Sequence, residues 1–167
     1  MSTPPRRLYL IRHAIAAERG PTWPDDRRRP LTKRGVKRMR QVTDGFAALD
    51  EPLALILTSP LTRALETAAI VVRGLAPRPA VRVLPGLAPG APPARTAAAV
   101  ARAAGRSRCV ALVGHEPDLG MLAAWLIGAA RPVPFKKGGI CRIDVAHWPP
   151  DGSGQLIWLA TPKMLRR

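Results

Sequence analysis

Two adjacent residues, Arg12 and His13, have side chains that could act together on a phosphoryl group. They follow the short apolar run Leu8–Ile11, which has the length and composition of a buried strand. A strand of a parallel sheet delivers the residues after its carboxyl end into the crevice where ligands bind. A guanidinium matches the geometry of phosphate oxygens, and an imidazole can attack phosphorus as a nucleophile. The pair therefore indicates a candidate site for phosphoryl chemistry.

Two further residues of the same kinds follow other apolar runs. Arg63 comes shortly after Leu53–Leu57, in the first turn of an expected helix, and His115 follows Cys109–Val113 at the start of another. Because the carboxyl ends of parallel strands lie at one edge of a sheet, we expect Arg63 and His115 to approach His13. The N-termini of the two helices would add N–H donors and a positive dipole end, which favour a bound anion.

Alternating apolar runs and helical patterns carry these residues. The strands are expected at Leu8–Ile11, Leu53–Leu57, Val81–Leu84, Cys109–Val113, Gly139–Ala146 and Gln155–Ala160. The helices are expected at Thr32–Leu49, Pro60–Arg73, Arg95–Ala104 and Pro117–Ile127. Thr32 is the expected N-cap of the first helix, and Leu49 is the last residue of its buried stripe. This order predicts an α/β fold, a three-layer αβα sandwich with a mostly parallel central sheet and an antiparallel edge strand.

The length and composition favour one domain. With 167 residues and 47% hydrophobic content, the chain can bury one sizeable core, so we predict a single domain over residues 1–167. Residues 1–7 are small, polar and basic, and they are expected to form a flexible N-terminus. The apolar runs at 8–11 and 120–130 are too short for a signal peptide and a membrane span, respectively. A cytoplasmic protein without a membrane partner is the expectation.

The two cysteines and the glycines before the fifth strand are interpreted structurally. Cys109 and Cys141 stand outside any Cys/His cluster, so no metal site is predicted. Buried free thiols are expected, and a disulfide is the alternative. Gly138 and Gly139 are expected to shape a bulge rather than to bring the backbone to the site.

The chain is strongly basic, with 27 Lys and Arg against 11 Asp and Glu and a formal net charge of +16. Such a field attracts phosphorylated proteins, polyphosphate or nucleic acid. The alternative is a solvated basic surface that reflects a composition rich in Ala, Arg, Pro and Gly. Nucleic acid is not an expected partner, because the sequence lacks interleaved aromatic residues and recognisable nucleic-acid-binding modules.

Four segments, in this order, resemble the motifs of the histidine phosphatase (phosphoglycerate mutase-like) superfamily. They are Leu8–Ala14, Arg29–Gly35, Thr58–Ala68 and Leu112–Pro117. The small size and the segments Gly114–Pro117 and Lys136–Ile140 resemble most the SixA-type phosphohistidine phosphatases of this superfamily. The resemblance extends to about Pro162 and implies a phosphoglycerate mutase-like fold. One position departs from the pattern, since Ala14 stands where many members have the Gly of an Arg-His-Gly (RHG) motif.

The resemblance implies a role for each of the four residues. His13 would be the catalytic nucleophile that is transiently phosphorylated. Arg12 and Arg63 would bind the phosphoryl oxygens, and His115 would complete the phosphate-binding pocket as a cation or a hydrogen-bond donor. Two guanidiniums and an imidazole can neutralise a phosphoryl group, so no metal or other cofactor is expected. Attack requires an unprotonated nitrogen on His13, and we expect its other ring nitrogen to donate to a backbone carbonyl.

The identity of a proton donor is left open. In phosphoglycerate mutases and sugar phosphatases a Glu or Asp follows the third strand, whereas residues 84–92 here contain no carboxylate. Glu116 is the possible proton donor, and its alternative role is to cap the following helix. Glu18, Asp25 and Asp26, in the loop after the first strand, are weaker candidates. A phosphohistidine needs this proton less than an alkyl ester does, because an alkoxide is a poor leaving group.

The sequence therefore predicts a metal-independent phosphatase that forms a phosphohistidine intermediate and releases inorganic phosphate. The expected substrate is phosphohistidine on proteins, because the brief segment between the third and fourth strands suits a side chain presented by another protein. A phosphatase of small phosphomonoesters or nucleotides on the same site is the alternative, and a non-catalytic polyanion-binding protein is a third. The basic residues of Arg27–Arg29 and Lys33–Arg38 could attract an acidic partner or form a solvated face.

Overall fold

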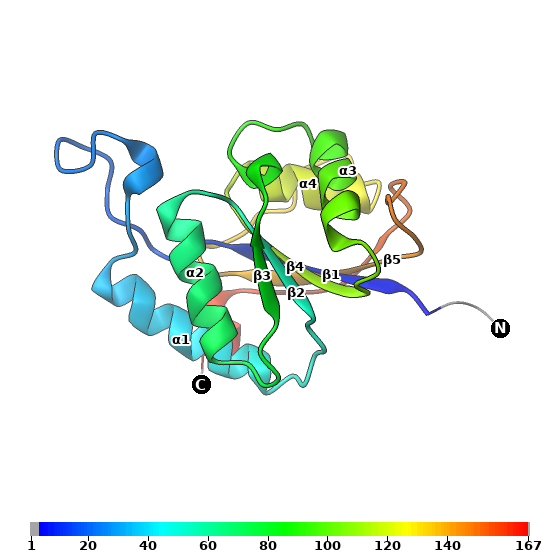
Figure 1. Ribbon diagram of the computed structural model, residues 1–167, viewed down its shortest axis with the longest axis horizontal. Coiled ribbons are helices and arrows are strands. Elements are labelled where there is room, and N and C mark those ends of the chain that lie inside the picture. Colours follow the sequence, from blue (N-terminus) through cyan, green and yellow to red (C-terminus); the bar gives the residue numbers. More distant parts are fainter. Residues whose placement is uncertain (1–3, 167) are drawn as a thin grey trace.

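One mixed sheet forms the middle layer of the computed structural model, which describes residues 4–166 (Figure 1). Its strands are β1 (Arg6–Arg12), β2 (Leu55–Thr58), β3 (Ala80–Val83), β4 (Cys109–Gly114), β5 (Ile140–Val145) and β6 (Gln155–Ala160). They lie in the order β3-β2-β4-β1-β5-β6. The pairs β2–β3, β2–β4 and β1–β4 are parallel, and β5 pairs antiparallel with both β1 and β6. The predicted parallel sheet with an antiparallel edge is confirmed.

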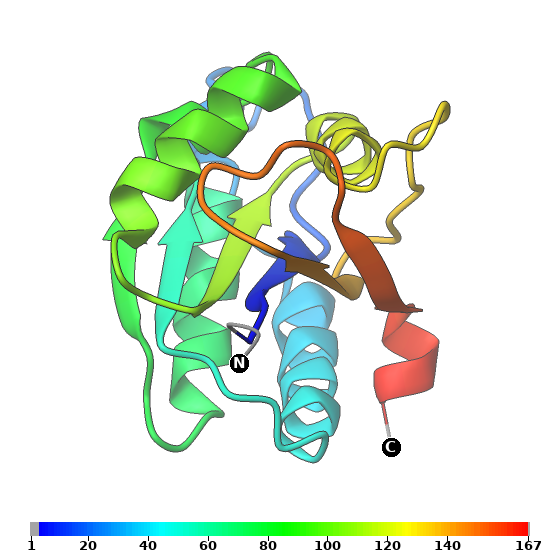
Figure 2. The ribbon, with the colours of Figure 1, turned by 90° about the vertical axis from the view of Figure 1, so that its right-hand side faces the viewer.

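Helices cover both faces of the sheet. They are α1 (Lys33–Ala47), α2 (Thr62–Arg73), α3 (Pro93–Ala104), α4 (Asp118–Leu126) and α5 (Pro162–Leu165), with short 3-10 turns η1 (Asp26–Arg28) and η2 (Pro85–Leu87). Figure 1 shows α1 and α2 on one side of the sheet and α3 and α4 on the other. Figure 2 shows the short α5 near α1, which it contacts. The three-layer αβα fold is therefore the one predicted, while α5 is too short to show a helical pattern in the sequence.

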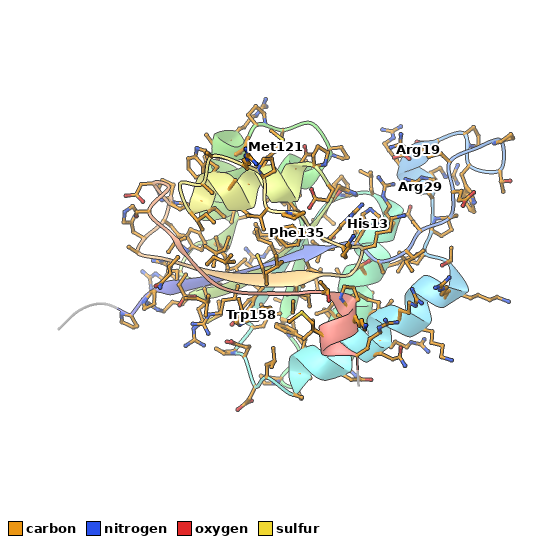
Figure 3. The ribbon with its side chains drawn as sticks, turned by 180° about the vertical axis from the view of Figure 1, so that it is seen from behind. His13, Arg19, Arg29, Met121, Phe135 and Trp158 are labelled. Atoms are coloured by element: carbon orange, nitrogen blue, oxygen red, sulfur yellow. The ribbon has the colours of Figure 1, made fainter. Side chains whose placement is uncertain are left out.

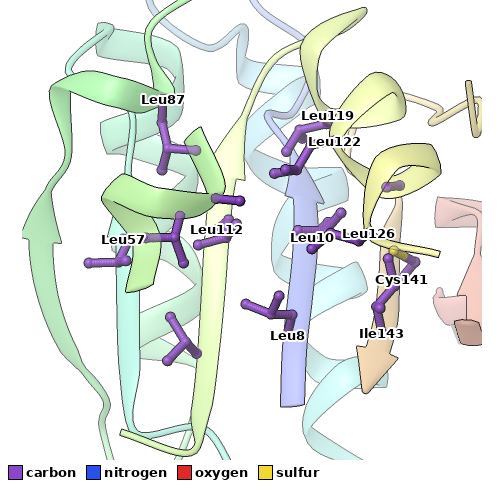
Figure 4. Packing of buried hydrophobic residues seen from close by; sticks show 14 of the residues in the cluster. Leu8, Leu10, Leu57, Leu87, Leu112, Leu119, Leu122, Leu126, Cys141 and Ile143 are labelled. Carbon is purple, nitrogen blue, oxygen red and sulfur yellow. The ribbon is translucent and has the colours of Figure 1, made fainter. Parts of the chain in front are cut away.

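The side chains of β1 alternate between two hydrophobic cores. Leu8 and Leu10 pack under α3 and α4, in the core drawn in Figure 4. Tyr9 and Ile11 point to the opposite face and pack under α1 and α2. Successive side chains of a strand point to opposite faces, so a central strand buried on both faces is a continuous apolar run. This is why Leu8–Ile11 could be identified as a strand from its composition.

The first helix begins where the sequence predicts and ends slightly earlier. The Oγ1 atom of Thr32 accepts a hydrogen bond from the backbone N–H of Gly35 at 2.9 Å, which confirms Thr32 as the N-cap. The helix ends at Ala47, and Leu49, assigned to the buried stripe, is 47% exposed. That assignment was wrong because the chain turns away after the helix, with Asp50 at a φ of 52°.

The N-terminal strand is longer than predicted. Arg6 and Arg7 were expected in a flexible N-terminus of residues 1–7, but both belong to β1 and pair with β5. The backbone N–H of Arg7 also donates to the carbonyl of Arg108 at 2.7 Å. Backbone hydrogen bonds between strands do not require apolar side chains. The two arginines at the start of β1 therefore gave no hydrophobic pattern from which this part of the strand could be predicted. Residues 1–3 of that expected segment lie outside the described residues.

The two cysteines are free thiols on separate strands. Cys109 begins β4 and is half-buried, and Cys141 lies on β5 and is buried. Strand β1 runs between them, with Arg7 opposite Cys109 and Leu10 opposite Cys141. Two strand spacings amount to roughly 9.5 Å, which is beyond the reach of a disulfide. The expectation of free thiols therefore holds in this fold.

No helix within residues 4–166 combines the length and the apolar character needed to cross a lipid bilayer.

Candidate active site

Three neighbouring strands end at the same level of the sheet. In the order β2-β4-β1, Arg12 stands opposite Gly114, and Thr58 stands opposite Val113. The residues that follow these strands stay close together, since the N–H of His13 donates to Gly114 O at 3.0 Å. Figure 3 shows His13 at this carboxyl edge. The expected convergence of separate strand ends is what the topology produces.

His13 is held in the tautomer that leaves the lone pair on Nε2. Its Nδ1 lies 2.7 Å from the carbonyl oxygen of Ala14, and a carbonyl can only accept a hydrogen bond, so Nδ1 carries the proton. In the neutral ring, Nε2 then keeps its lone pair. Burial, together with the charges of Arg63 and Arg12, lowers the pKa of His13 to about 4 despite the opposing hydrogen bond to Ala14. The imidazole is therefore neutral near pH 7, as a nucleophile requires.

Arg63 contacts the reactive nitrogen of His13. Its Nε donates to His13 Nε2 at 3.3 Å. Its two terminal nitrogens donate to Asp26, one to the backbone carbonyl at 2.8 Å and one to Oδ2 at 3.1 Å. A guanidinium has five N–H groups, so two remain for another acceptor. The buried Arg63 is thus aligned by a carboxylate and still has donors for an anion at His13.

Arg12 approaches from the end of β1. One terminal nitrogen donates to the carbonyl of Phe135 at 2.6 Å. Its buried Nε has no hydrogen-bond partner among the described residues. A buried donor without a partner costs free energy of about 1–3 kcal/mol, so Arg12 Nε is a donor that a bound anion could satisfy.

His115 lies next to His13, with the two ring centroids 5.2 Å apart. Its Nε2 is 2.7 Å from the Oγ of the fully buried Ser59, whereas its Nδ1 has no hydrogen-bond partner within the described part of the chain. Burial and the neighbouring His13 lower the pKa of His115 to about 3. His115 is therefore a neutral group in this state, which favours the hydrogen-bond donor over the cation among the two roles expected for it. If Ser59 donates to Nε2, then Nδ1 carries a proton that an anion can accept.

Three of the four side chains present donors that have no acceptor among the described residues. The donors are Arg12 Nε, Nδ1 of His115 and two N–H groups of Arg63. The Nε of Arg63 contacts His13 Nε2, and the ring centroid of His115 lies 5.2 Å from that of His13. Helices α2 and α4 begin directly after Leu61 and Pro117, and neither has a side-chain cap. The positive dipole ends of these helices add positive potential at the same edge of the sheet. This arrangement can hold a tetrahedral oxyanion against a nucleophilic nitrogen.

Asp26 is a site residue whose role the sequence did not reveal. Its carboxylate forms salt bridges with Arg63 at 3.1 Å, with Arg29 at 2.7 Å and with Arg19 at 2.8 Å. Burial opposes its ionisation, but the hydrogen bond from Arg29 and the charge of Arg63 lower its pKa overall. A carboxyl group with a lowered pKa is a poor proton donor. Asp26 is therefore better suited to orient Arg63 than to serve as the proton donor, a role for which the sequence makes it a weaker candidate.

Two other polar contacts position the nucleophile segment. The hydroxyl of Thr67, one helical turn after Arg63, accepts the backbone N–H of Ala14 at 3.1 Å and donates to the carbonyl of Arg63 at 2.7 Å. The four-residue spacing on α2 puts Thr67 and Arg63 on one helix face, which was the available sequence signal. Ser59 holds His115, and no comparable signal in the sequence indicates that role.

The glycine segment before β5 contributes directly to the site. The backbone N–H of Gly138 approaches the carbonyls of Arg12 and His13, at 3.1 Å each. Gly138 has a φ of 79°, a conformation that favours glycine. The expectation that these glycines only shape a bulge was wrong, because they bring the backbone against the residues of the nucleophile.

Glu116 supports the wall behind Arg12. Its Oε1 accepts the backbone N–H of Phe135 at 3.1 Å, and the carbonyl of Phe135 receives Arg12. Burial raises the pKa of Glu116, against smaller lowering contributions that include Arg12. Through the backbone of Phe135, Glu116 is therefore connected to the guanidinium of Arg12 rather than to the ring of His13. The role of Glu116 as proton donor stays a prediction.

The described residues contain no group of three His, Cys, Asp or Glu side chains arranged to hold a metal ion. The site is instead rich in cationic and neutral nitrogen donors, which are groups that hold an anion.

Fold and site together define a phosphoryl-transfer protein of the histidine phosphatase type, and comparisons with known proteins agree. The sequence profile of the histidine phosphatase superfamily (branch 1) matches residues 8–89. The chain belongs to the histidine phosphatase superfamily.

Three relatives are informative. An uncharacterized protein of Picosynechococcus sp. is 38% identical over 165 residues, which cover 95% of this chain and 98% of the relative. The structure of the protein histidine phosphatase SixA complexed with tungstate has a TM-score of 0.84 and 25% identity, covering 96% of this chain and 99% of that chain. A structure from Agrobacterium tumefaciens, described as a SixA phosphohistidine phosphatase by inference, has a TM-score of 0.79 and 26% identity, covering 96% and 100%. Family and neighbours support a phosphatase activity.

Proposed function

We propose that this protein is a metal-independent phosphatase that forms a phosphohistidine intermediate on His13 and acts on phosphohistidine carried by proteins. The observation that carries the proposal is the His13 ring, with Nδ1 bound to a carbonyl and Nε2 facing Arg63. The similarity to SixA supports the choice of substrate. Phosphorylated proteins are thus the proposed partners, and inorganic phosphate is the product.

The first step transfers the phosphoryl group to the enzyme. Nε2 of His13 attacks phosphorus, and the bond from phosphorus to the substrate nitrogen breaks. The substrate imidazole leaves as a neutral ring when its other nitrogen carries a proton, so this step needs no strong acid. Arg12, Arg63 and His115 neutralise the equatorial oxygens, which is the main demand of phosphoryl transfer.

The second step regenerates the enzyme. A water oxygen attacks the phosphorus, the bond to His13 Nε2 breaks, and inorganic phosphate leaves. His13 Nδ1 keeps its proton throughout, because its hydrogen bond to Ala14 is unaffected by reaction at Nε2. No metal takes part in either step as proposed.

The substrate class is supported by what the chain lacks between β3 and α3. Residues 84–92 connect these elements through the short turn η2 and contain no carboxylate. Hydrolysis of an alkyl phosphomonoester would require a proton for the leaving alkoxide, whereas an imidazole is a better leaving group. This difference favours phosphohistidine over small phosphomonoesters and nucleotides.

Phosphate trapping tests the intermediate. Wild-type protein incubated with labelled phosphoramidate in EDTA should retain label at a histidine, and turnover should be the same with and without EDTA. His13→Asn should lose both the label and more than about 10³-fold of the turnover, by analogy with the loss of a catalytic nucleophile. The matched control is His147→Asn, because His147 is exposed and its side chain bonds only to Pro149 and Asp151 within residues 4–166. Unchanged turnover in His13→Asn would refute the mechanism.

A substrate panel tests the specificity. The ratio kcat/KM should be higher for a phosphohistidine peptide than for sugar phosphates and nucleotides. The reverse order would replace the proposed substrate by a small phosphomonoester while leaving the intermediate intact. Salt-sensitive binding of nucleic acid without turnover of any phosphorylated compound would favour a non-catalytic polyanion-binding protein.

A further inference from the structure

A cavity of about 600 Å³ lies beside the site, between α1, α5 and the segment before β5. Arg12, Ala14 and Gly138 form the wall that it shares with the site. Lys137 also lines the cavity, and its charge contributes to lowering the pKa of His13, so the cavity and the nucleophile are electrostatically connected. A volume of this size can accept a drug-sized ligand or a short stretch of polypeptide.

Five further cations surround this cavity. They are Arg38, Lys136, Lys137, Lys163 and Arg166. No Asp or Glu occurs among the described residues that line the cavity, and none of the five cations has a carboxylate within 4.0 Å in the described part of the chain. Burial lowers the pKa of Arg38, and the positive charges of Arg34, on the same helix, and of Arg166, just after α5, lower it further. Such a concentration of like charge is relieved by an anionic ligand.

The floor of the cavity is apolar. Ile15, Met39, Val42 and Pro162 line it from the loop after β1, from α1 and from α5. An apolar floor within a cationic rim suits a ligand that has both carboxylates and hydrocarbon side chains. Inorganic polyphosphate has no apolar surface, and nucleic acid would stack on aromatic side chains, which are absent from the described lining residues.

We infer that this cavity, the cationic groove, binds an acidic segment with apolar side chains in the protein that carries the phosphohistidine. The inference rests on the proposed function, since the groove adjoins the pocket that would receive the phosphoryl group. The carboxylates of the segment pair with the cations of the rim, and its apolar side chains contact the floor. The groove thereby distinguishes phosphoproteins by the residues that flank the phosphohistidine.

Two synthetic peptides test the inference. Each has one phosphohistidine, followed in one peptide by alternating Glu and Leu and in the other by alternating Gln and Leu. The wild-type protein should hydrolyse the acidic peptide with a kcat/KM on the order of tenfold higher, because complementary charge accelerates association. Equal kcat/KM values for the two peptides would overturn the inference.

Charge reversal in the groove is the decisive variant. Arg38→Glu with Lys163→Glu should remove the preference for the acidic peptide and leave the turnover of phosphoramidate unchanged, because neither side chain belongs to the phosphate pocket. The milder double variant, Arg38→Gln with Lys163→Gln, should remove about half of the preference for the acidic peptide on a logarithmic scale. It tests the same charges without introducing carboxylates that could disturb folding. The matched control is Arg95→Glu with Arg102→Glu on α3, which changes the net charge equally on the opposite face of the sheet.

The outcomes separate this inference from the proposed function. Loss of the preference in the α3 control would show that the whole charge of the protein, rather than the groove, attracts the peptide, and would overturn the inference. Failure to hydrolyse phosphoramidate would refute the proposed function alone. Binding of the unphosphorylated peptides, measured by fluorescence anisotropy, then still tests the groove. Displacement of the acidic peptide by a tighter-binding oligonucleotide would overturn the inference in favour of nucleic acid.

Discussion

His13 and Arg63 illustrate how a single carboxylate can control a reactive pair. Arg63 touches Nε2 of His13 through Nε, while both of its terminal nitrogens donate to Asp26. A long arginine side chain loses conformational freedom when it is held in one geometry, and Asp26 supplies the contacts that offset this loss. The direction of the guanidinium toward the nucleophile therefore depends on a residue that touches neither His13 nor, as proposed, the phosphoryl group.

Replacing Asp26 by Asn should reveal this positioning role. Asp26→Asn removes the negative charge that faces Arg63, Arg29 and Arg19. We expect kcat to fall about 10–100-fold, which is the typical loss when a residue that orients an active-site group is replaced. The change in KM should be smaller. The neighbouring Asp25→Asn serves as control, because the carboxylate of the half-exposed Asp25 contacts only Arg27 among the described residues. Equal losses in the two variants would show a general effect on the loop.

The buried histidines make the stability of the protein sensitive to acid. Burial lowers the pKa of His13 to about 4 and that of His115 to about 3, whereas an unfolded chain protonates histidine near pH 6.5. Between about pH 4 and 6.5 the unfolded state therefore binds more protons than the folded state. The free energy of unfolding consequently decreases as the pH falls through this window and is fully retained above it.

Urea titrations at several pH values test this dependence. From pH 7 to pH 5 each of the two histidines should cost on the order of 1–2 kcal/mol of unfolding free energy. The loss should be smaller in His13→Asn and unchanged in His147→Asn, since His147 is exposed. A loss in His13→Asn as large as that of the wild-type protein would contradict the expected neutral state of His13.

At the scale of elements, α1 is held close to the segment that follows the nucleophile. The carbonyl of Ile15 accepts the backbone N–H of Thr32 at 3.0 Å, just before the helix begins. A Cβ atom added to Gly35 would overlap this carbonyl. Glycine at position 35 thus permits the close approach that places Ala14 and Ile15 over α1.

Substitution of Gly35 should disturb both stability and activity. Gly35→Ala would gain about 1 kcal/mol in helix propensity, but relieving the overlap with Ile15 costs about 1–3 kcal/mol, so a net loss is expected. Thermal unfolding should occur a few degrees lower, and kcat should fall because Ile15 lies two residues after His13. The exposed Arg34→Ala is the control. A Gly35→Ala protein that is more stable than the wild type would show that α1 moves without strain.

At the scale of the whole molecule, the charge is far from balanced. Against a net charge of +16, the arginines that pair with carboxylates in the described residues are Arg7, Arg19, Arg27, Arg29, Arg63 and Arg142. Three of these arginines pair with Asp26, and two pair with the half-buried Glu51, which also accepts hydrogen bonds from Tyr9 and Trp158. Most of the basic residues therefore repel one another across the surface.

Salt should accordingly stabilise the folded protein. Raising sodium chloride from about 0.02 M to 0.5 M shortens the Debye length severalfold and screens the repulsion, so Tm should rise by several degrees. Chloride is preferred to phosphate in this measurement, since inorganic phosphate is the proposed product and would stabilise the protein by binding as well as by screening. A Tm that falls with salt would mean that the ion pairs outweigh the repulsion between unpaired cations.

The sequence by itself determined the sheet, its layers and the four residues that meet at its edge. Strands buried on both faces must be apolar, and parallel strands must end at the same edge, so Arg12, His13, Arg63 and His115 could be assembled from local patterns. These inferences need only short stretches of sequence and a general rule of topology.

Only the tertiary structure decided how those four residues are held. Three contacts hold them, and each joins segments that are far apart in the sequence. The carboxylate of Asp26 binds Arg63, the hydroxyl of Ser59 binds His115, and the backbone N–H of Gly138 donates to the carbonyls of Arg12 and His13. The path of a loop depends on which polar groups find partners once the sheet has formed, and no short pattern encodes that choice. The cationic groove arises in the same way, because it exists only where α5 packs beside α1.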